Sequence, residues 1–132
     1  MPEKIIVSET FPVKAEQVYR AWLDSKAHAA FTGASAKVVP KVGGKFSAWD
    51  GYIGGKTLEL EPNHRIVQSW RTTDFPEGAE DSMLEVVLEE TKGKTKVTLA
   101  HSNIPEGQGE GYAQGWREFY FEPMKKYFSR MG

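Results

Sequence analysis

The three histidines are the side chains of this 132-residue sequence best suited to acid–base or metal chemistry. His28, His64 and His101 lie far apart, and none has another histidine at the spacing of a metal-ligand pair. We expect His28 on a short surface helix, His64 in a turn, and only His101 on the inner face of a strand. A lone inward-facing histidine is more often a hydrogen-bonded core residue than a base or a ligand. The sequence therefore predicts no metal site and no catalytic histidine.

Three glycine-containing segments resemble nucleotide-binding or catalytic loops without completing their patterns. Gly55-Lys56-Thr57 matches the end of a phosphate-binding loop, but that motif requires glycine at position 50, which is Asp50. Gly107–Gly111 lacks the third glycine of a dinucleotide fingerprint, because the next residue is Tyr112. Segment 33–37 fails the last position of a nucleophile elbow. We expect no cofactor and no catalytic constellation, so an enzyme is the weakest hypothesis.

Composition narrows the class of protein further. The 17 basic and 18 acidic side chains give a net charge of −1, which argues against a nucleic-acid binder and a polybasic membrane anchor. The absence of cysteine excludes disulfides, and no apolar run approaches the roughly 18 residues that span a bilayer. The first residues show no signal peptide. We expect one cytoplasmic domain over residues 1–132.

The elements that would position these residues follow from hydrophobic periodicity. Alternation predicts a first strand over Glu3–Phe11, helical spacing predicts a helix over Lys14–Asp24, and Ser25 is a candidate cap for a short second helix that ends near Phe31. A long helix is expected from about Gly109 to Arg130. Between them, turn signals separate six candidate strands: Ala36–Pro40, Gly44–Asp50, Tyr52–Glu61, His64–Thr73, Ser82–Glu90 and Thr95–Ser102. This order predicts an α+β protein with an antiparallel sheet of six or seven strands.

The last helix carries an unusual density of aromatic side chains. Seven of the 16 aromatic residues lie between Tyr112 and Phe128, most of them at helical spacing. Pro123 falls within this segment, and a proline inside a helix removes a hydrogen bond and clashes with the carbonyl four residues earlier. We therefore expect the helix to kink or lose regularity between Phe119 and Pro123.

An aromatic helix that lies across a curved sheet can seal a core or leave a cavity. The four tryptophans are consistent with either arrangement, and aromatic-lined cavities are a common form of small-molecule site. If Trp116 is pure core, its truncation to alanine should cost about 3–5 kcal/mol; if it lines an empty pocket, about 1–2 kcal/mol. The candidate lining residues are Trp22, Phe31, Phe46, Trp49, Gln68, Trp70, Leu99, His101, Trp116 and Tyr120.

An acidic stretch has two interpretations. It is either a solvated sheet face and loop, or a patch for a basic partner surface. Its members are Glu77, Glu80, Asp81, Glu85, Glu89 and Glu90, and no basic residue follows until Lys92.

A set of short motifs, in order and at specific spacing, resembles the activator of heat shock protein 90 ATPase homologue family, a member of the START-like (Bet v 1-like, SRPBCC) superfamily. The likeness extends from Ile5 to Phe128 and is greatest to the C-terminal domain of the eukaryotic co-chaperone. The residues that carry it are Gly43-Gly44-Lys45-Phe46, Asp50-Gly51, Gly54-Gly55, Leu60-Glu61-Pro62, Ile66-Val67, Trp70, Pro76-Glu77-Gly78, Gly115-Trp116 and Tyr120-Phe121-Glu122.

This resemblance implies a helix-grip fold, in which a curved antiparallel sheet wraps a long C-terminal helix and two short helices follow the first strand. It implies a co-chaperone-like interaction domain whose partner is a heat shock protein 90 type chaperone. Alternatively, it implies binding or transport of a small hydrophobic ligand in the cavity between sheet and helix. The chain leaves no room for the separate N-terminal domain of the eukaryotic activator, so a free-standing relative is the expectation.

Overall fold

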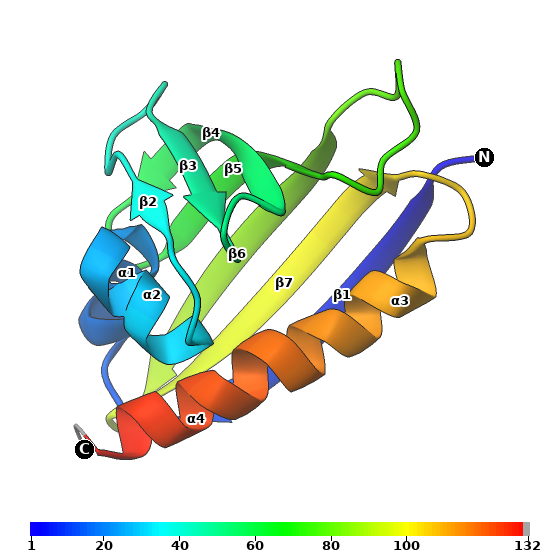
Figure 1. Cartoon of the computed structure of the whole chain (residues 1–132). Helices are drawn as coiled ribbons and strands as arrows, with labels where there is room; N and C mark the ends of the chain where they lie inside the picture. The colour runs from blue at the N-terminus through cyan, green and yellow to red at the C-terminus, as the bar shows by residue number, and fades with distance from the viewer. Residues whose placement is uncertain (131–132) are drawn as a thin grey trace.

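The computed structural model describes residues 1–130, which form one antiparallel sheet of seven strands and five helical segments (Figure 1). The strands are ordered β1-β7-β6-β5-β4-β3-β2. The α+β class and the helix-grip architecture are thereby confirmed. Residues 131–132 of the expected domain lie outside the described residues. The elements in chain order are β1 (Glu3–Phe11), α1 (Ala15–Leu23), α2 (Ser25–Thr32), β2 (Lys37–Val38), β3 (Lys45–Ala48), β4 (Ile53–Glu61), β5 (Arg65–Thr72), β6 (Ser82–Thr91), β7 (Lys94–Ile104), α3 (Gly109–Gly115), η1 (Trp116–Phe121) and α4 (Glu122–Ser129).

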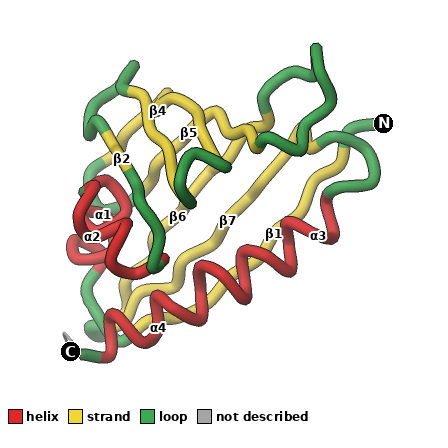
Figure 2. Tube along the Cα trace, viewed as in Figure 1, coloured by secondary structure: helices red, strands yellow, loops and turns green. Residues whose placement is uncertain are grey.

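The C-terminal helix, made of α3, η1 and α4, runs along one face of the sheet, and α1 and α2 close one end of the molecule (Figure 2). The core lies between this helix and the inner sheet face. Edge-to-face contacts of Phe11 with Phe121 and Phe128, at centroid distances of 5.9 and 5.6 Å, join the first strand to the last helix. Because residues far apart in the sequence meet here, the helix is held by tertiary packing rather than by its own propensity.

The last helix departs from regular α geometry in the turns that precede Pro123. Residues Trp116–Phe121 form a π-helical segment, and the Glu122 amide donates to the Arg117 carbonyl, five residues earlier. Proline has no amide hydrogen and its ring would clash with the Phe119 carbonyl in an α-helix. A widened turn before proline relieves that clash. The expected irregularity is confirmed, although it begins at Trp116 rather than at Phe119.

The caps of the two short helices come from residues other than Ser25. The side chain of Asp24 accepts a hydrogen bond of 2.8 Å from the Ala27 amide, so Asp24, not Ser25, caps α2. The Ser25 hydroxyl instead accepts from the Val38 amide at 2.8 Å and ties α2 to the edge strand β2. At the start of α1, the Ala15 amide donates to Glu90 of β6 at 2.8 Å. Strand β6 therefore adds a cap from a distant part of the chain to the local bond from the Lys14 amide to Gln17 Oε1, which is 3.1 Å long.

Three of the six residues of the acidic stretch have partners within the fold. Glu85 forms an ion pair with Arg65, and Asp81 lies 3.0 Å from Arg71. Glu90 accepts the hydrogen bond from the Ala15 amide of α1. Together these contacts favour the interpretation of the stretch as a solvated sheet face and loop over that of a binding patch for a basic partner.

Candidate functional site

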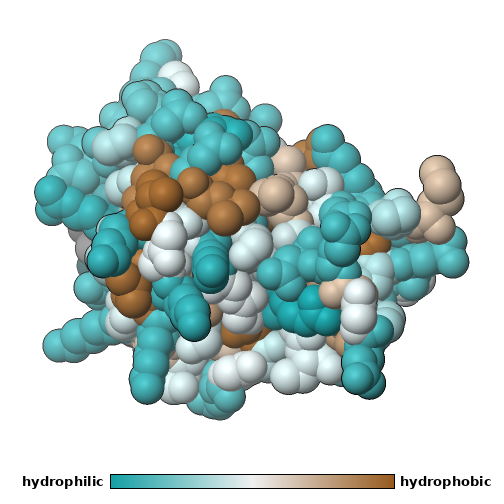
Figure 3. Space-filling model, turned by 90° about the horizontal axis from the view of Figure 1, so that it is seen from above, coloured by the Kyte–Doolittle hydropathy of each residue, from teal (hydrophilic) through white to brown (hydrophobic). Residues whose placement is uncertain are grey.

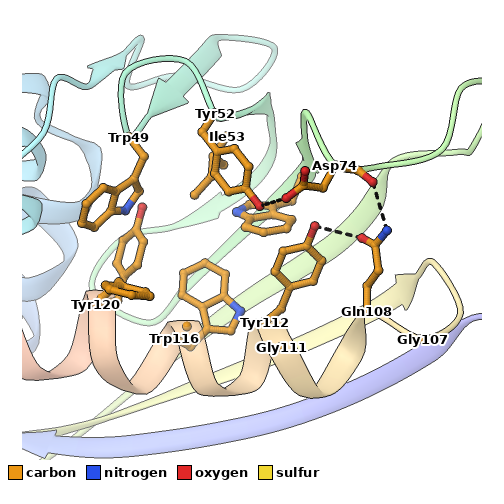
Figure 4. A pocket seen from close by; sticks show the side chains of 13 residues that line it. Trp49, Tyr52, Ile53, Asp74, Gly107, Gln108, Gly111, Tyr112, Trp116 and Tyr120 are labelled. Carbon is orange, nitrogen blue, oxygen red and sulfur yellow. Dashed lines mark hydrogen bonds between the residues drawn. The ribbon is translucent and has the colours of Figure 1, made fainter.

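A pocket of about 630 Å³ opens between the C-terminal helix and the sheet (Figure 4), a volume within the range of small-molecule sites. Its walls come from the β3–β4 turn, the end of β5, the loop after β7, and the α3–η1 segment. The 13 lining residues are Trp49, Tyr52, Ile53, Trp70, Asp74, Gly107, Gln108, Gly111, Tyr112, Gly115, Trp116, Phe119 and Tyr120.

One wall is a row of aromatic rings on the C-terminal helix. Tyr112, Trp116 and Tyr120 recur every four residues and therefore share a helix face. The rings of Trp116 and Tyr120 are 4.7 Å apart between centroids, and Trp116 also contacts Trp70 of β5 at 5.5 Å. Phe119, at the rim, is 56 % exposed. The helix thus presents a continuous apolar surface to the pocket.

Trp49 reaches the pocket from an unusual backbone conformation. Its φ is 54° and that of the next residue, Asp50, is 58°, both in the left-handed region. A bulky residue rarely adopts this conformation, which costs on the order of 1–3 kcal/mol and is found most often at functional sites. The turn is closed by the Tyr52 amide, which donates to the Trp49 carbonyl at 3.1 Å. This conformation sets the Trp49 ring 5.9 Å from Phe119, across the apolar end of the pocket.

The opposite end of the pocket is polar. The Tyr112 hydroxyl donates to Gln108 Oε1 at 2.9 Å, and Gln108 Nε2 donates to the Asp74 carbonyl at 3.0 Å (Figure 4). The Tyr52 hydroxyl donates to Asp74 Oδ2 at 2.5 Å. Partial burial and the neighbouring Asp74 carboxylate raise the pKa of Tyr52 to about 12, so the phenol keeps its proton at neutral pH. Thr72 completes the group, with its hydroxyl 2.6 Å from that of Tyr112.

His101 lies beneath the pocket floor as a neutral core residue. Its Nδ1 accepts from the Trp116 indole at 3.1 Å, and its Nε2 lies 2.7 Å from the Ser82 hydroxyl. Burial lowers the pKa of His101 to about 3, so it carries no proton to exchange near neutrality. This arrangement supports the interpretation of His101 as a hydrogen-bonded core residue.

His28 lies on the short helix α2, as expected, but its side chain faces inward and is buried, with 3 % of its surface exposed. Its ring lies 3.0 Å from the Trp22 carbonyl and 2.9 Å from the Tyr120 hydroxyl, and burial lowers its pKa to about 4. The carbonyl accepts only, so Nδ1 carries the proton and Nε2 accepts from Tyr120. His28 therefore fixes the hydroxyl end of one wall residue.

The ten predicted lining residues divide into two groups. Trp49, Trp70, Trp116 and Tyr120 line the pocket, whereas the others are buried behind it, as illustrated by the Trp22 indole, which donates to Gln68 at 3.2 Å. The buried group is Trp22, Phe31, Phe46, Gln68, Leu99 and His101. Their role in binding stays a prediction.

Sequence reasoning missed the polar end of the pocket. Asp74 and Gln108 lie in loops that are distant in the sequence, and no local pattern signals that they meet. The helical spacing of Tyr112 with Trp116 was a usable signal for one of the missed residues.

Two other kinds of feature are expected to be absent: a metal site and a membrane-spanning segment. Among residues 1–130, no three potential metal ligands of the His, Asp or Glu types converge. No helix in this range is long and apolar enough to cross a membrane.

A curved sheet that grips a long helix over an aromatic pocket defines a START-like, helix-grip domain. The profile of the family described as "Activator of Hsp90 ATPase homolog 1-like protein" matches residues 12–129, and the chain belongs to this family. The activator of 90 kDa heat shock protein ATPase homolog 1 from Homo sapiens is 34% identical over 125 residues, which are 95% of this chain and 37% of that protein. The homologue from Dictyostelium discoideum is 28% identical over 93% of this chain and 32% of its own length. The chain thus spans about a third of these relatives.

Solved structures agree with this assignment. PFC0360w, an HSP90 activator from Plasmodium falciparum, superposes with a TM-score of 0.86 at 29% identity and covers 96% of both chains. CalU16 from Micromonospora echinospora has a TM-score of 0.80 at 25% identity, over 97% of this chain and 77% of that one. The Aha1 dimer from Colwellia psychrerythraea, with a TM-score of 0.79 at 18% identity over 96% of each chain, shows the same fold.

Proposed function

We propose that this domain is a binding module for an Hsp90-type chaperone. The observation that carries the proposal is the family match over residues 12–129, together with 34% identity to the human activator over 95% of the chain. The Plasmodium falciparum HSP90 activator, which matches this chain end to end, supports it further. Because the chain corresponds to 37% of the human activator, both chaperone binding and ATPase stimulation are proposals to be tested separately.

The outer face of strands β2–β4 is the surface we propose for this contact. Lys45 and Lys56 lie directly opposite each other on β3 and β4, and Lys37 on β2 shares their outward face because it pairs with Ser47. Like charges opposite each other destabilise a sheet. Within residues 1–130, none of these lysines lies within ion-pair distance of a carboxylate. We call Lys37, Lys45 and Lys56 the lysine face.

Exposed apolar side chains accompany the lysine face. Val42 is 60 % exposed in the loop between β2 and β3, and Val39 and Leu58 are also exposed. The Gly43 amide donates to the Thr57 carbonyl at 2.7 Å and the Thr57 amide donates to the Gly44 carbonyl at 2.9 Å, which brings this loop beside β4. Figure 3, which views the molecule from above, shows hydrophobic side chains gathered over the β2–β4 end with hydrophilic ones around them. Basic side chains together with exposed apolar ones fit an acidic protein surface with its own apolar patch.

Binding to a purified Hsp90-type chaperone tests this proposal by calorimetry, with chaperone ATPase rates as a second measurement. We expect a dissociation constant of tens of micromolar or lower. The double substitution Lys45→Glu with Lys56→Glu should weaken binding at least about tenfold, because charge reversal opposes an acidic partner. The matched control, Lys92→Glu with Lys94→Glu in the β6–β7 turn, makes the same charge change elsewhere and should leave binding unchanged. No binding by the unaltered chain at these concentrations would refute the proposal.

A second candidate function is favoured by the pocket itself. We propose that it binds a small, largely hydrophobic molecule, because seven aromatic side chains line about 630 Å³ of open space. Native mass spectrometry and thermal-shift screening would detect such a ligand. In Gly115→Leu, the new Cβ meets only Phe119, at 3.8 Å, so the side chain has room to fill the pocket. This variant should fold and lose the ligand; retained binding would place the ligand elsewhere.

A further inference from the structure

The charges of the pocket define which ligands it can hold. None of its 13 lining residues is lysine, arginine or histidine, and Asp74 is the one charged side chain among them. From this asymmetry we infer that the pocket selects an organic cation: an aromatic or aliphatic ammonium whose apolar body lies among the tryptophans and whose charge lies at Asp74. This inference rests on the proposed ligand-binding function and names the class of ligand.

The hydrogen-bond directions at the polar end favour a ligand that donates protons. Thr72 Oγ1 accepts from the Asp74 amide at 3.1 Å and, because the Tyr112 proton is used at Gln108, donates its own proton to the Tyr112 hydroxyl. Tyr112 in turn donates to Gln108, and Tyr52 donates to Asp74 Oδ2. Each hydroxyl proton at this end is thus used within the protein.

What remains at the polar end is acceptor capacity. Asp74 Oδ1 accepts no hydrogen bond from the described residues, 1–130. The Asp74 side chain is exposed at the rim, where a ligand can reach it. The indole N–H groups of Trp49 and Trp70 are neutral donors, and they do not balance the charge of a carboxylate. A bound fatty acid or other anion would therefore place its charge against Asp74 without a cationic partner.

The aromatic walls of the pocket also attract a positively charged ligand. The faces of aromatic rings carry a partial negative potential and attract ammonium groups within about 6 Å. Next to Asp74, Tyr52 and Tyr112 are both pocket residues, and the Tyr112 ring meets Trp70 edge-to-face at 5.0 Å. Glu110, exposed on α3 between the lining residues Gln108 and Gly111, contributes a further negative charge near the rim. The carboxylate and the rings thus favour the same ligand charge.

Three naphthalene probes of equal size test the inference: 2-naphthylmethylammonium, 2-naphthylmethanol and 2-naphthoate. Affinities are measured by calorimetry at neutral pH on the intact chain. We expect the ammonium to bind at least about tenfold more tightly than the naphthoate, with the alcohol between them. Asp74→Asn keeps an acceptor for the Tyr52 hydroxyl but removes the charge. It should abolish most of the preference for the ammonium and change the affinity for the alcohol less than about twofold.

Glu110→Gln is the matched control, because it removes one negative charge from the rim without altering a lining residue. It should preserve the ammonium preference to within about threefold. Equal or tighter binding of naphthoate would overturn the inference while leaving a ligand pocket intact, as would an ammonium preference that survives Asp74→Asn. If none of the probes binds at millimolar concentration and Gly115→Leu changes nothing, the ligand-binding function itself fails.

Discussion

The indole of Trp116 donates a hydrogen bond of 3.1 Å to Nδ1 of His101, which joins the C-terminal helix to strand β7 of the sheet. The other ring nitrogen of His101 faces Ser82, whose hydroxyl proton is used at the Trp70 carbonyl, 2.7 Å away. Nε2 must then carry the His101 proton and donate it to Ser82. A second proton on Nδ1 would face the indole N–H. The contact that positions this wall of the pocket therefore requires a neutral histidine.

We predict that the protein loses stability as the pH falls below about 6.5. Burial lowers the pKa of His28 from 6.5 to about 4 and that of His101 to about 3. Between these values the unfolded chain binds protons that the folded chain does not, so stability is complete above pH 6.5 and decreases on acidification. Each histidine contributes a slope of about 1.4 kcal/mol per pH unit. Urea unfolding at pH 7 and 5.5 should differ by roughly 2–3 kcal/mol.

Two variants check the cause of this acid sensitivity. His101→Gln offers an acceptor to Trp116 and a donor to Ser82 but does not titrate, so it should reduce the pH dependence by about half. His64→Gln, at an exposed turn residue, should leave the dependence unchanged. An equal slope in all three proteins would show that carboxylates, not buried histidines, dominate the acid transition.

We predict opposite tautomers for the two buried histidines. His28 donates from Nδ1 to the Trp22 carbonyl, whereas His101 accepts at Nδ1 from Trp116. Nitrogen-15 NMR of the imidazole rings at pH 7 distinguishes protonated from bare ring nitrogens. The same tautomer at both sites, or a protonated ring at either, would contradict this hydrogen-bond assignment.

Most of the fold could be predicted from the sequence because its strands obey a period of two. In β6, Leu84, Val86 and Leu88 face the core. Such a pattern also fixes strand register wherever one face is buried. The π-helical segment could be anticipated because Pro123 conflicts with α geometry through local sterics alone. These features depend on neighbours in the sequence, so sequence reasoning was able to find them.

The parts that could not be predicted depend on contacts between distant residues. Asp24 and Ser25 are both good cap residues, and the choice between them follows from the bond of Ser25 to Val38 on β2. His28 is buried because Tyr120, 92 residues later, lies over it. For the same reason, six of the ten candidate lining residues lie buried behind the pocket. Periodicity tells which side chains point inward, but not which of them border empty space.

Trp116 is expected to behave as a core residue in stability measurements, although it lines the pocket. Only 3 % of its surface is exposed, and it contacts rings from three other elements. Trp116→Ala should therefore cost about 3–5 kcal/mol, by chemical denaturation, rather than the 1–2 kcal/mol expected of a bare wall. Trp116→Phe keeps a ring but leaves His101 Nδ1 without its hydrogen-bond donor. This variant should lower the free energy of unfolding by about 1–3 kcal/mol. A cost of about 1 kcal/mol for the alanine variant would show that the pocket is larger in solution.

The adjacent glycines Gly54 and Gly55 should respond very differently to alanine. A Cβ on Gly55 would lie 1.9 Å from the Ser69 carbonyl oxygen of β5, and a backbone atom in a paired strand cannot move aside. A Cβ on Gly54 would meet only the Phe46 carbonyl, at an ordinary 3.7 Å. Gly55→Ala should thus destabilise the protein by about 3 kcal/mol or more, and Gly54→Ala by less than about 1 kcal/mol. Thermal and urea unfolding of the two variants measure the difference, and equal stabilities would show that β4 and β5 do not approach as closely as described.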